Sequence, residues 1–184
     1  MSIVLLGSTS GSITLQEPAV SGSTVLSLPA VTGTVLTTTS PKAGNVIQVV
    51  NGVYSTQVST TSTTFVTTNL TATITPSSSS SKILAVYSFG DVACIPPSDG
   101  AEFALYRNGS AIGQPLNSRV NYNDTSASET QMITAVSGTY FDSPSSTSAL
   151  TYTIFVRNNA SGGITTQVFR DSTQGSITLM EIAG

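Results

Sequence analysis

The segment VTTNLTATITP at residues 66–76 shows the pattern that decides the fold. Leu70, Ala72 and Ile74 alternate with threonines, so apolar side chains recur at every second position. Because successive side chains of a β-strand point to opposite faces, this alternation is typical of a strand with one buried side. The segment therefore predicts a half-buried strand.

Similar strand-like runs continue on both sides of this segment, and loops rich in serine, proline and glycine at 76–82, 142–148 and 158–163 separate several of them. No window keeps the period of 3.6 residues that a helix requires. We expect an all-β antiparallel sandwich over residues 45–184, most naturally a jelly roll, with an immunoglobulin-like sandwich as the alternative. The runs are 45–58, 63–76, 82–92, 101–109, 110–116, 130–141, 150–158, 164–171 and 176–183.

One turn in this region has a clear sequence signal. Asn108-Gly109 lies between the apolar runs FALYR and SAIG. A two-residue type I′ turn needs positive φ at both positions, which Asn and Gly tolerate. The dipeptide predicts a β-hairpin.

The N-terminal part of the chain contains a repeat of 11 residues. GSITLQEPAVS (11–21) is followed by GSTVLSLPAVT (22–32) and by the shorter GTVLTTTSP (33–41). Glycine permits turns and proline cannot donate to a strand ladder, so each repeat predicts a short strand that ends in a bend. We expect residues 1–40, here called the arm, to form an extended β-strand region before the body of residues 45–184.

Short strands of this kind offer little surface to fold on, because a small sheet is marginal without a partner to pack against. We therefore predict that the arm buries its apolar side chains against another chain, for attachment and trimerisation. The alternative is that the arm adds edge strands to its own domain. The predicted contact residues are Ile13, Leu15, Val25, Leu26, Leu28, Val35 and Leu36.

Composition restricts the possible functions. The chain has 30 serines and 29 threonines, charged residues make up 8%, and the net charge is −3. The six basic residues are scattered, so no track for neutralising phosphates exists and we expect no nucleic-acid partner. No cationic start with a long apolar run marks a secretory signal, and no run of about 18 apolar residues predicts a membrane span. Without a secretory signal, the four Asn-x-Ser/Thr sequences, which could be N-glycosylation sites, are interpreted as incidental to the serine- and threonine-rich composition; they begin at Asn69, Asn108, Asn123 and Asn159.

The sequence gives little support for an active site with a serine or cysteine nucleophile. The chain has no histidine, which excludes the usual acyl-transfer triad. Cys94, the single cysteine, lies among apolar neighbours and is predicted to pack as a small hydrophobe. Ser79 and Lys82 have an S-x-x-K spacing, but within a run of five serines a solvated loop is the better interpretation. We expect no enzyme activity.

Carboxylates and amides leave two further alternatives open. Asp91, Asp99, Glu102 and Asp142 could include a glycosidase pair, although solvated loop acids are the default. Asn121, Asn123 and Asp124 could offer oxygen ligands to Ca²⁺, although such residues are common in plain turns. We expect no catalytic residue, metal or cofactor.

Aromatic residues could form a platform that binds sugars. Most of them follow strand alternation, which favours packing in the core. Tyr122, in the polar stretch VNYNDTS, is the exception and a candidate for an exposed contact. The aromatics in question are Tyr87, Tyr106, Tyr122, Tyr140, Tyr152, Phe65, Phe89, Phe103, Phe141, Phe155 and Phe169.

Four stretches together resemble a group of virion structural proteins of tailed bacteriophages, particularly those that infect cyanobacteria. They are ITLQEPAVSGSTVLSLPAVTGTVLT (13–37), STTFVTTNLTATITPSSSSSKILAVYS (62–88), FALYRNGSAI (103–112) and SITLMEIAG (176–184). In that group a segment like LPAVTGTVL precedes a trimeric β domain. The resemblance covers most of the chain, and it implies a fibre, spike or capsid decoration protein without catalytic residues.

The resemblance also implies partners and a location. We expect a homotrimer on the outer surface of the virion, bound to the major capsid protein or to other virion proteins. A 40-residue arm reaches at most about 140 Å when fully extended, which favours a capsid decoration (cement) protein over a whole tail fibre. The alternative is a fibre or spike module that binds host polysaccharide through the loops at 117–129 and 142–148.

Overall fold

The computed structural model describes residues 3–6, 10, 12–15, 41–95, 98–112, 116–123, 132–159 and 164–184. The chain divides into two compact units, Met1–Val35 and Leu36–Gly184. In the first unit, β1 (Ile3–Leu6) pairs with β2 (Ser12–Leu15) in antiparallel orientation, with Ile3 opposite Leu15. The first 11-residue repeat thus contributes a strand, and the second and third repeats up to residue 40 lie outside the described residues.

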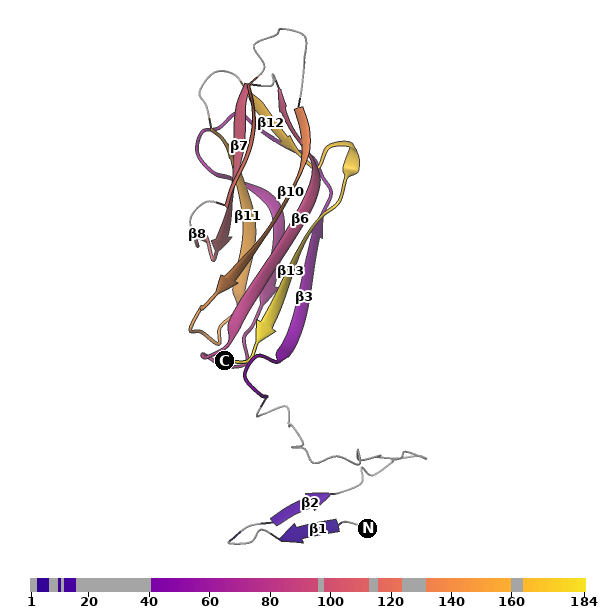
Figure 1. Ribbon diagram of the computed structural model, residues 1–184, viewed down its shortest axis with the longest axis vertical. Coiled ribbons are helices and arrows are strands. Elements are labelled where there is room, and N and C mark those ends of the chain that lie inside the picture. Colours follow the sequence, from indigo (N-terminus) through magenta and orange to yellow (C-terminus); the bar gives the residue numbers. More distant parts are fainter. Residues whose placement is uncertain are drawn as a thin grey trace. The chain divides into compact units, whose positions relative to one another are not determined.

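The second unit forms a sandwich of two antiparallel sheets (Figure 1). The six-stranded sheet has the order β3-β13-β6-β12-β4, with β10 on the other side of β6. The five-stranded sheet has the order β5-β11-β7-β8, with β9 also paired to β7. The strands are β3 (Val46–Tyr54), β4 (Val58–Thr60), β5 (Val66–Ile74), β6 (Lys82–Ile95), β7 (Ser98–Arg107), β8 (Ser110–Ala111), β9 (Leu116–Asn123), β10 (Met132–Asp142), β11 (Leu150–Asn158), β12 (Thr165–Val168) and β13 (Gly175–Ile182).

The predicted fold class is confirmed. Every strand pair in the described residues is antiparallel, and the chain changes sheet at each step from β4 to β7 and again from β9 to β12. Such alternation between sheets is how a jelly roll is connected. In the first unit, β2 lies in the first 11-residue repeat, where a short strand was predicted, whereas β1 was not predicted.

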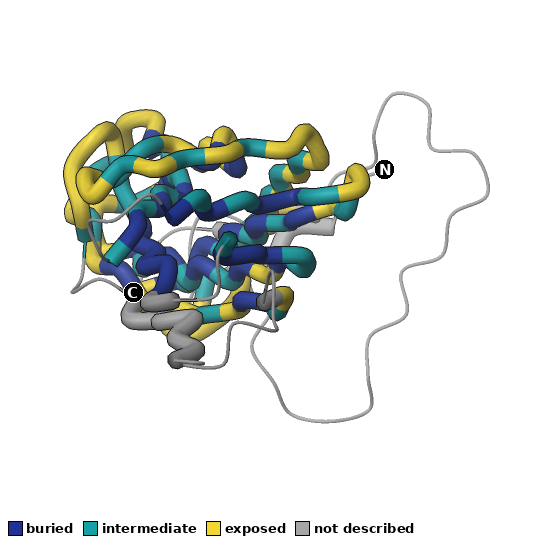
Figure 2. Tube along the Cα trace, turned by 90° about the horizontal axis from the view of Figure 1, so that it is seen from above, coloured by how far each residue is buried: buried dark blue, intermediate teal, exposed yellow. Residues whose placement is uncertain are grey.

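Alternating strands place the core between the sheets. Leu70, Ala72 and Ile74 of β5 are buried, while the threonines between them are exposed. The largest buried side chains include Tyr87, Phe89, Phe103, Tyr152 and Phe169. Figure 2 shows the buried segments lying inside the body, with exposed segments around its outside.

The Asn108-Gly109 hairpin is confirmed. The two residues connect β7 to β8 with φ of 49° and 80°, the left-handed values that a type I′ turn needs. The Asn108 Oδ1 atom also accepts a hydrogen bond from the Thr151 backbone N–H at 2.8 Å. The turn is therefore anchored to β11.

Three predicted strand runs differ from the observed elements. The run 164–171 is a strand only through Val168, because Phe169 adopts a left-handed φ of 57° and a 3₁₀ turn (Arg170–Ser172) follows. The run 110–116 contributes the two-residue strand β8, and the start of β9 at Leu116. The run 45–58 is divided between β3 and β4. Alternation identified these runs, but local turns decide where each strand ends.

Candidate functional site

The predicted arm contacts fall mostly outside the described residues. Ile13 and Leu15 lie in β2, where backbone pairing joins them to Leu5 and Ile3. Their role in binding another chain stays a prediction. Val25, Leu26, Leu28, Val35 and Leu36 lie outside the described residues.

The outer face of the six-stranded sheet carries a row of apolar side chains. Val49 of β3 lies opposite Met180 of β13, Met180 lies opposite Leu84 of β6, and Leu84 lies opposite Phe141 of β10. Their neighbours along each strand point inward; Leu179, for example, is buried. These four side chains, the apolar row, therefore cross four strands on the solvent side.

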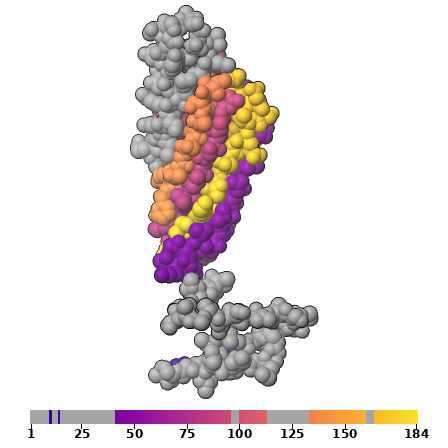
Figure 3. All heavy atoms as spheres, turned by 45° about the vertical axis from the view of Figure 1, so that its right-hand side comes forward, coloured from indigo at the N-terminus to yellow at the C-terminus, as the bar shows by residue number. Residues whose placement is uncertain are grey.

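The apolar row is open to solvent at both ends. Val49 is 56% exposed and Phe141 is 57% exposed, while Met180 and Leu84 are half-buried between them. Val46 and Ile182, paired at the end of β3 and β13, extend the apolar surface. Figure 3 shows this face, with β10, β6, β13 and β3 side by side in orange, magenta, yellow and purple. Exposed apolar surface of this kind commonly marks an interaction site.

In the part of the chain that the structure describes, the large exposed hydrophobic side chains all lie on this sheet. They are Val46, Val49, Val53, Ile133 and Phe141, all on β3 or β10. The five-stranded sheet instead presents paired threonines. The Thr71 and Thr153 hydroxyls lie 3.0 Å apart, and those of Thr73 and Thr151 lie 2.9 Å apart. The two faces of the sandwich thus differ in chemistry.

An aromatic cluster lies on the outer side of the five-stranded sheet. The Tyr106 and Phe155 rings stack with centroids 3.9 Å apart, and Phe65 meets Tyr106 edge-on at 6.1 Å. The Arg157 guanidinium lies 4.6 Å from the Phe65 ring centroid. The prediction that aromatics pack in the core is correct for Tyr87, Phe89, Phe103, Tyr152 and Phe169, but it is wrong for this cluster and for Phe141. The alternation of side chains along a strand predicts two faces, but when both carry apolar residues it does not show which face is buried.

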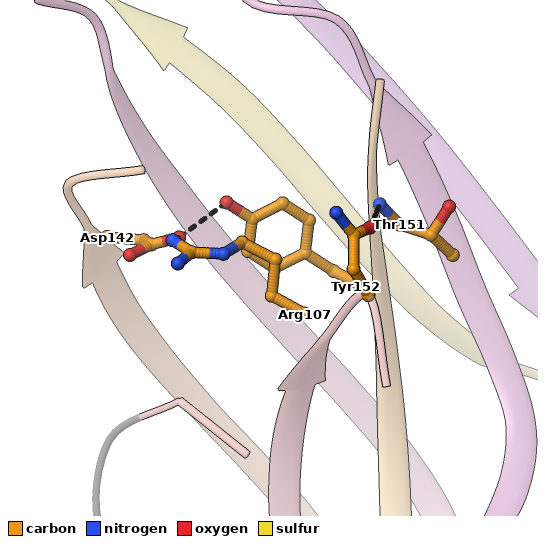
Figure 4. Close-up of polar contacts among 5 residues, drawn as sticks. Arg107, Asp142, Thr151 and Tyr152 are labelled. Carbon is orange, nitrogen blue, oxygen red and sulfur yellow. Dashed lines mark hydrogen bonds and ion pairs between the residues drawn. The ribbon is translucent and has the colours of Figure 1, made fainter. Parts of the chain in front are cut away.

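Asp142 is held in an ion pair at the end of β10. Its Oδ2 atom accepts hydrogen bonds from Arg107 and from the Tyr152 hydroxyl, each at 2.6 Å (Figure 4). Burial and the hydrogen bond to Asp142 raise the pKa of Tyr152 above its ordinary value. Burial lowers the pKa of Arg107, but the hydrogen bond and charge of Asp142 outweigh this and raise it. Both partners keep their protons, so the cluster is a fixed structural link between β7, β10 and β11.

Two of the other candidate carboxylates, Glu102 and Asp91, lie beside different arginines. Glu102 Oε2 accepts two hydrogen bonds from Arg157, at 2.8 and 2.5 Å. Asp91 lies 3.9 Å from Arg170. Arg107 and Glu102 are five residues apart on β7, roughly 17 Å at strand rise, so Asp142 and Glu102 are not brought together as a glycosidase pair. Asp99 lies in β7, and its side chain is outside the described residues.

Glu181, which sequence analysis did not single out, is the best-bound carboxylate. It is fully buried; its Oε1 accepts hydrogen bonds from the Ser77 backbone N–H and from the Ser77 and Ser81 hydroxyls, each at 2.7 Å. Gln48 donates to Oε2 at 2.6 Å. Burial raises the pKa of Glu181, but these hydrogen bonds outweigh it and hold the pKa below its usual value. The carboxylate thereby fixes the serine-rich loop to β13 and β3.

The remaining candidates have no assembled site in the described ranges. Cys94 is buried as predicted, and burial raises the pKa of its thiol, although hydrogen bonds involving Thr166 and Ala101 lower it to a smaller extent. Ser79 lies exposed in the turn before β6. Asn121, Tyr122 and Asn123 lie in β9, with side chains outside the described residues, as is Asp124 altogether. Their roles in binding Ca²⁺ or sugar stay untested.

The described ranges contain neither a metal-binding cluster nor a membrane-spanning helix. No three histidine, cysteine, aspartate or glutamate side chains there gather closely enough to hold a metal ion. None of the described segments forms a helix with the length and hydropathy needed to cross a membrane.

Comparison with known proteins gives a distant likeness only. No protein-family model matches the chain, and no curated protein matches it. One similar solved structure is the 2.6 Å structure of infectious bursal virus derived T=1 particles, with 11% identity and a TM-score of 0.32. The match covers 94% of this chain and 43% of that one, so this chain spans less than half of that protein's length. A likeness at this level carries no argument about function.

Proposed function

We propose that this protein is a non-enzymatic structural protein of a virion, and that it acts as a capsid decoration (cement) protein. The observation that carries the proposal is that the body has its own hydrophobic core, while the apolar repeats lie in a separate N-terminal arm. This core is built from buried residues between Leu70 and Ala183. We infer that the apolar residues of the arm repeats bind another chain. The sequence resemblance to phage virion proteins supplies the partner class.

The proposed mechanism is stabilisation by mass action. The arm attaches to the assembled shell, through the major capsid protein or another virion protein, and to the arms of two sister chains. The body lies on the outer surface of the particle. A protein that binds only the assembled shell shifts the assembly equilibrium towards that state. No nucleic acid, membrane or cofactor takes part in this mechanism.

Removal of the arm tests the proposal. The chain without residues 1–40 keeps the whole described core and is expected to fold, but to lose binding to assembled capsids in a co-sedimentation assay. A full-length variant with Leu26→Asp and Leu28→Asp serves as a matched test of the apolar repeats, and Ser23→Asp with Ser27→Asp controls for added charge. Undiminished binding of the truncated body would refute the role of the arm.

A second function is favoured by the aromatic cluster on the five-stranded sheet. Half-exposed Phe65, Tyr106 and Phe155 lie near Arg157, which is a combination that can contact sugar rings and their hydroxyls. In this alternative the protein is a tail fibre or spike module that recognises host-surface polysaccharide. The loops at 117–129 and 142–148, with Tyr122, would add contacts.

The two functions are separated by one binding assay. Labelled protein is incubated with host cells and with extracted polysaccharide, using the Phe155→Ala and Tyr122→Ala variants beside the parent chain. Loss of cell binding in either variant, with capsid binding unchanged, would establish the polysaccharide role. Absence of binding by the parent chain would eliminate it.

A further inference from the structure

We propose that the outer face of β3, β13, β6 and β10, centred on the apolar row, packs against a second copy of this chain. The proposal rests on the homotrimer of the proposed function and names the body surface that the copies share. Val49, Met180, Leu84 and Phe141 lie in one register across the four strands. A face with adjacent apolar side chains and uncharged polar side chains beside them fits a protein partner.

Charge favours a copy of the same chain as the occupant. The outward positions next to the row are Asn51, Thr178, Val86 and Thr139, which lie in one register and carry no charge. Glu181, the nearby carboxylate, is buried on the inner side. Lys82, at the end of β6, is the single charged side chain among the described outward residues of the paired segments 46–53, 82–88, 137–141 and 176–182. Two copies can therefore approach without the repulsion that a charged face would cause.

The size of the face also favours a second copy of this chain as the partner. Four strands about 4.8 Å apart, paired over seven residues with a rise of about 3.4 Å, give a face on the order of 450 Å². A stable complex between free partners usually needs about 800 Å² on each side. The face is thus too small to hold a free partner firmly, but it suffices for copies that another segment already joins.

The start of the body lies beside this face. Gly44 donates a backbone hydrogen bond to Ala183, and Ala183 donates one to Asn45, each at 2.8 Å. These bonds fix residues 44–45 next to Ile182, which pairs with Val46 at the end of the apolar surface. The arm is joined covalently just ahead of this point. Arms that associate would raise the local concentration of the bodies, so that a weak face is occupied.

Oxidation of Met180 by hydrogen peroxide measures whether the face is covered. Met180 is partly exposed in the single chain, and a methionine thioether reacts only where the oxidant reaches it. In the full-length chain at high concentration we expect sulfoxide formation at Met180, measured by peptide mass spectrometry, to be about tenfold slower than in the unfolded chain, and to accelerate on dilution. The oligomeric mass is followed in parallel by light scattering.

Two double variants sharpen the test. Val49→Asp with Phe141→Asp places charge at both ends of the row, and Met180 should then oxidise rapidly at all concentrations. Thr67→Asp with Thr73→Asp adds the same charge to exposed positions of the five-stranded sheet and should behave as the parent chain. Equal and rapid oxidation in all three proteins would overturn the proposal, even where the arms keep the chains associated. Protection of Met180 that appears only on addition of capsids would overturn it as well.

The capsid-binding assay keeps this inference distinct from the proposed function. Protected Met180 without capsid binding would leave the shared face standing and refute the decoration role. Capsid binding with an unprotected Met180 would support the decoration role and refute the shared face.

Discussion

Gly52 and Thr71 bring β3 and β5 into contact at one side of the sandwich. A Cβ atom on residue 52 would lie 1.9 Å from the Thr71 carbonyl oxygen, which no real structure tolerates. We expect Gly52→Ala to destabilise the protein by about 1–3 kcal/mol, because the backbone of β5 must shift to accommodate the methyl group. The free energy of unfolding, measured in urea, checks this.

Gly90→Ala is the matched control for that substitution. A Cβ on residue 90 meets nothing within 4 Å, and its φ lies in the ordinary range. The unfolding free energy should change by less than about 0.5 kcal/mol. Equal losses in the two variants would contradict the close approach of β3 and β5.

Tyr152→Phe is expected to weaken the fold. The substitution removes the hydroxyl that donates to Asp142, which is buried and keeps only Arg107 among its described hydrogen-bond donors. A buried acceptor that loses a donor costs about 1–3 kcal/mol. Thermal unfolding should show a lower midpoint, and an unchanged midpoint would show that the Tyr152 hydroxyl contributes nothing.

Tyr87→Phe should have the opposite outcome. The Tyr87 hydroxyl is buried without a hydrogen-bond partner in the described part of the chain, and burial raises the pKa of Tyr87 to about 12. Removal of an unsatisfied buried group relieves a desolvation penalty of about 1–3 kcal/mol. We expect unfolding in urea to need the same or more denaturant; a clear loss of stability would contradict the geometry of this site.

Glu181 should make stability depend on acid pH. Its pKa is lowered in the folded state, so the ionised carboxylate stabilises the fold above the unfolded value of about 4.3, and this contribution disappears as the pH falls through the folded pKa. Glu181→Gln should be less stable at pH 7, because its amide would face the Gln48 amide, and its stability should fall less steeply towards pH 3 than that of the parent chain. Urea unfolding at several pH values measures both slopes. Parallel slopes would rule out a lowered pKa for Glu181.

Cys94 should be inert while the protein is folded. Its side chain is fully buried, and burial raises the pKa of the thiol, so little thiolate forms and reagents cannot reach it. At pH 8 we expect a disulfide reagent to modify the native chain at least about a hundredfold more slowly than the urea-unfolded chain. Rapid stoichiometric modification of the native protein would place the thiol at the surface.

Strands and turns could be predicted from the sequence wherever a residue and its near neighbours decide the backbone conformation. The alternation of Leu70, Ala72 and Ile74 predicted β5, and Asn108-Gly109 predicted the β7–β8 hairpin. The last strand also showed two apolar faces, with Ile177 and Leu179 on one side and Met180 and Ile182 on the other. A strand with two apolar faces indicates contacts on both sides, but the pattern does not show how far either contact surface extends.

The sequence by itself therefore determined the fold class, most of the strand-forming segments and the lack of a histidine-based active site, because these depend on composition and on a period of two residues. Only the tertiary structure decided which strands are neighbours. It joined Val49, Met180, Leu84 and Phe141 into one row, and it placed Asp142 against Arg107 and Tyr152. It also put Tyr106 and Phe155 on the outside. Cross-strand register links residues far apart in the chain, and no local pattern contains that information.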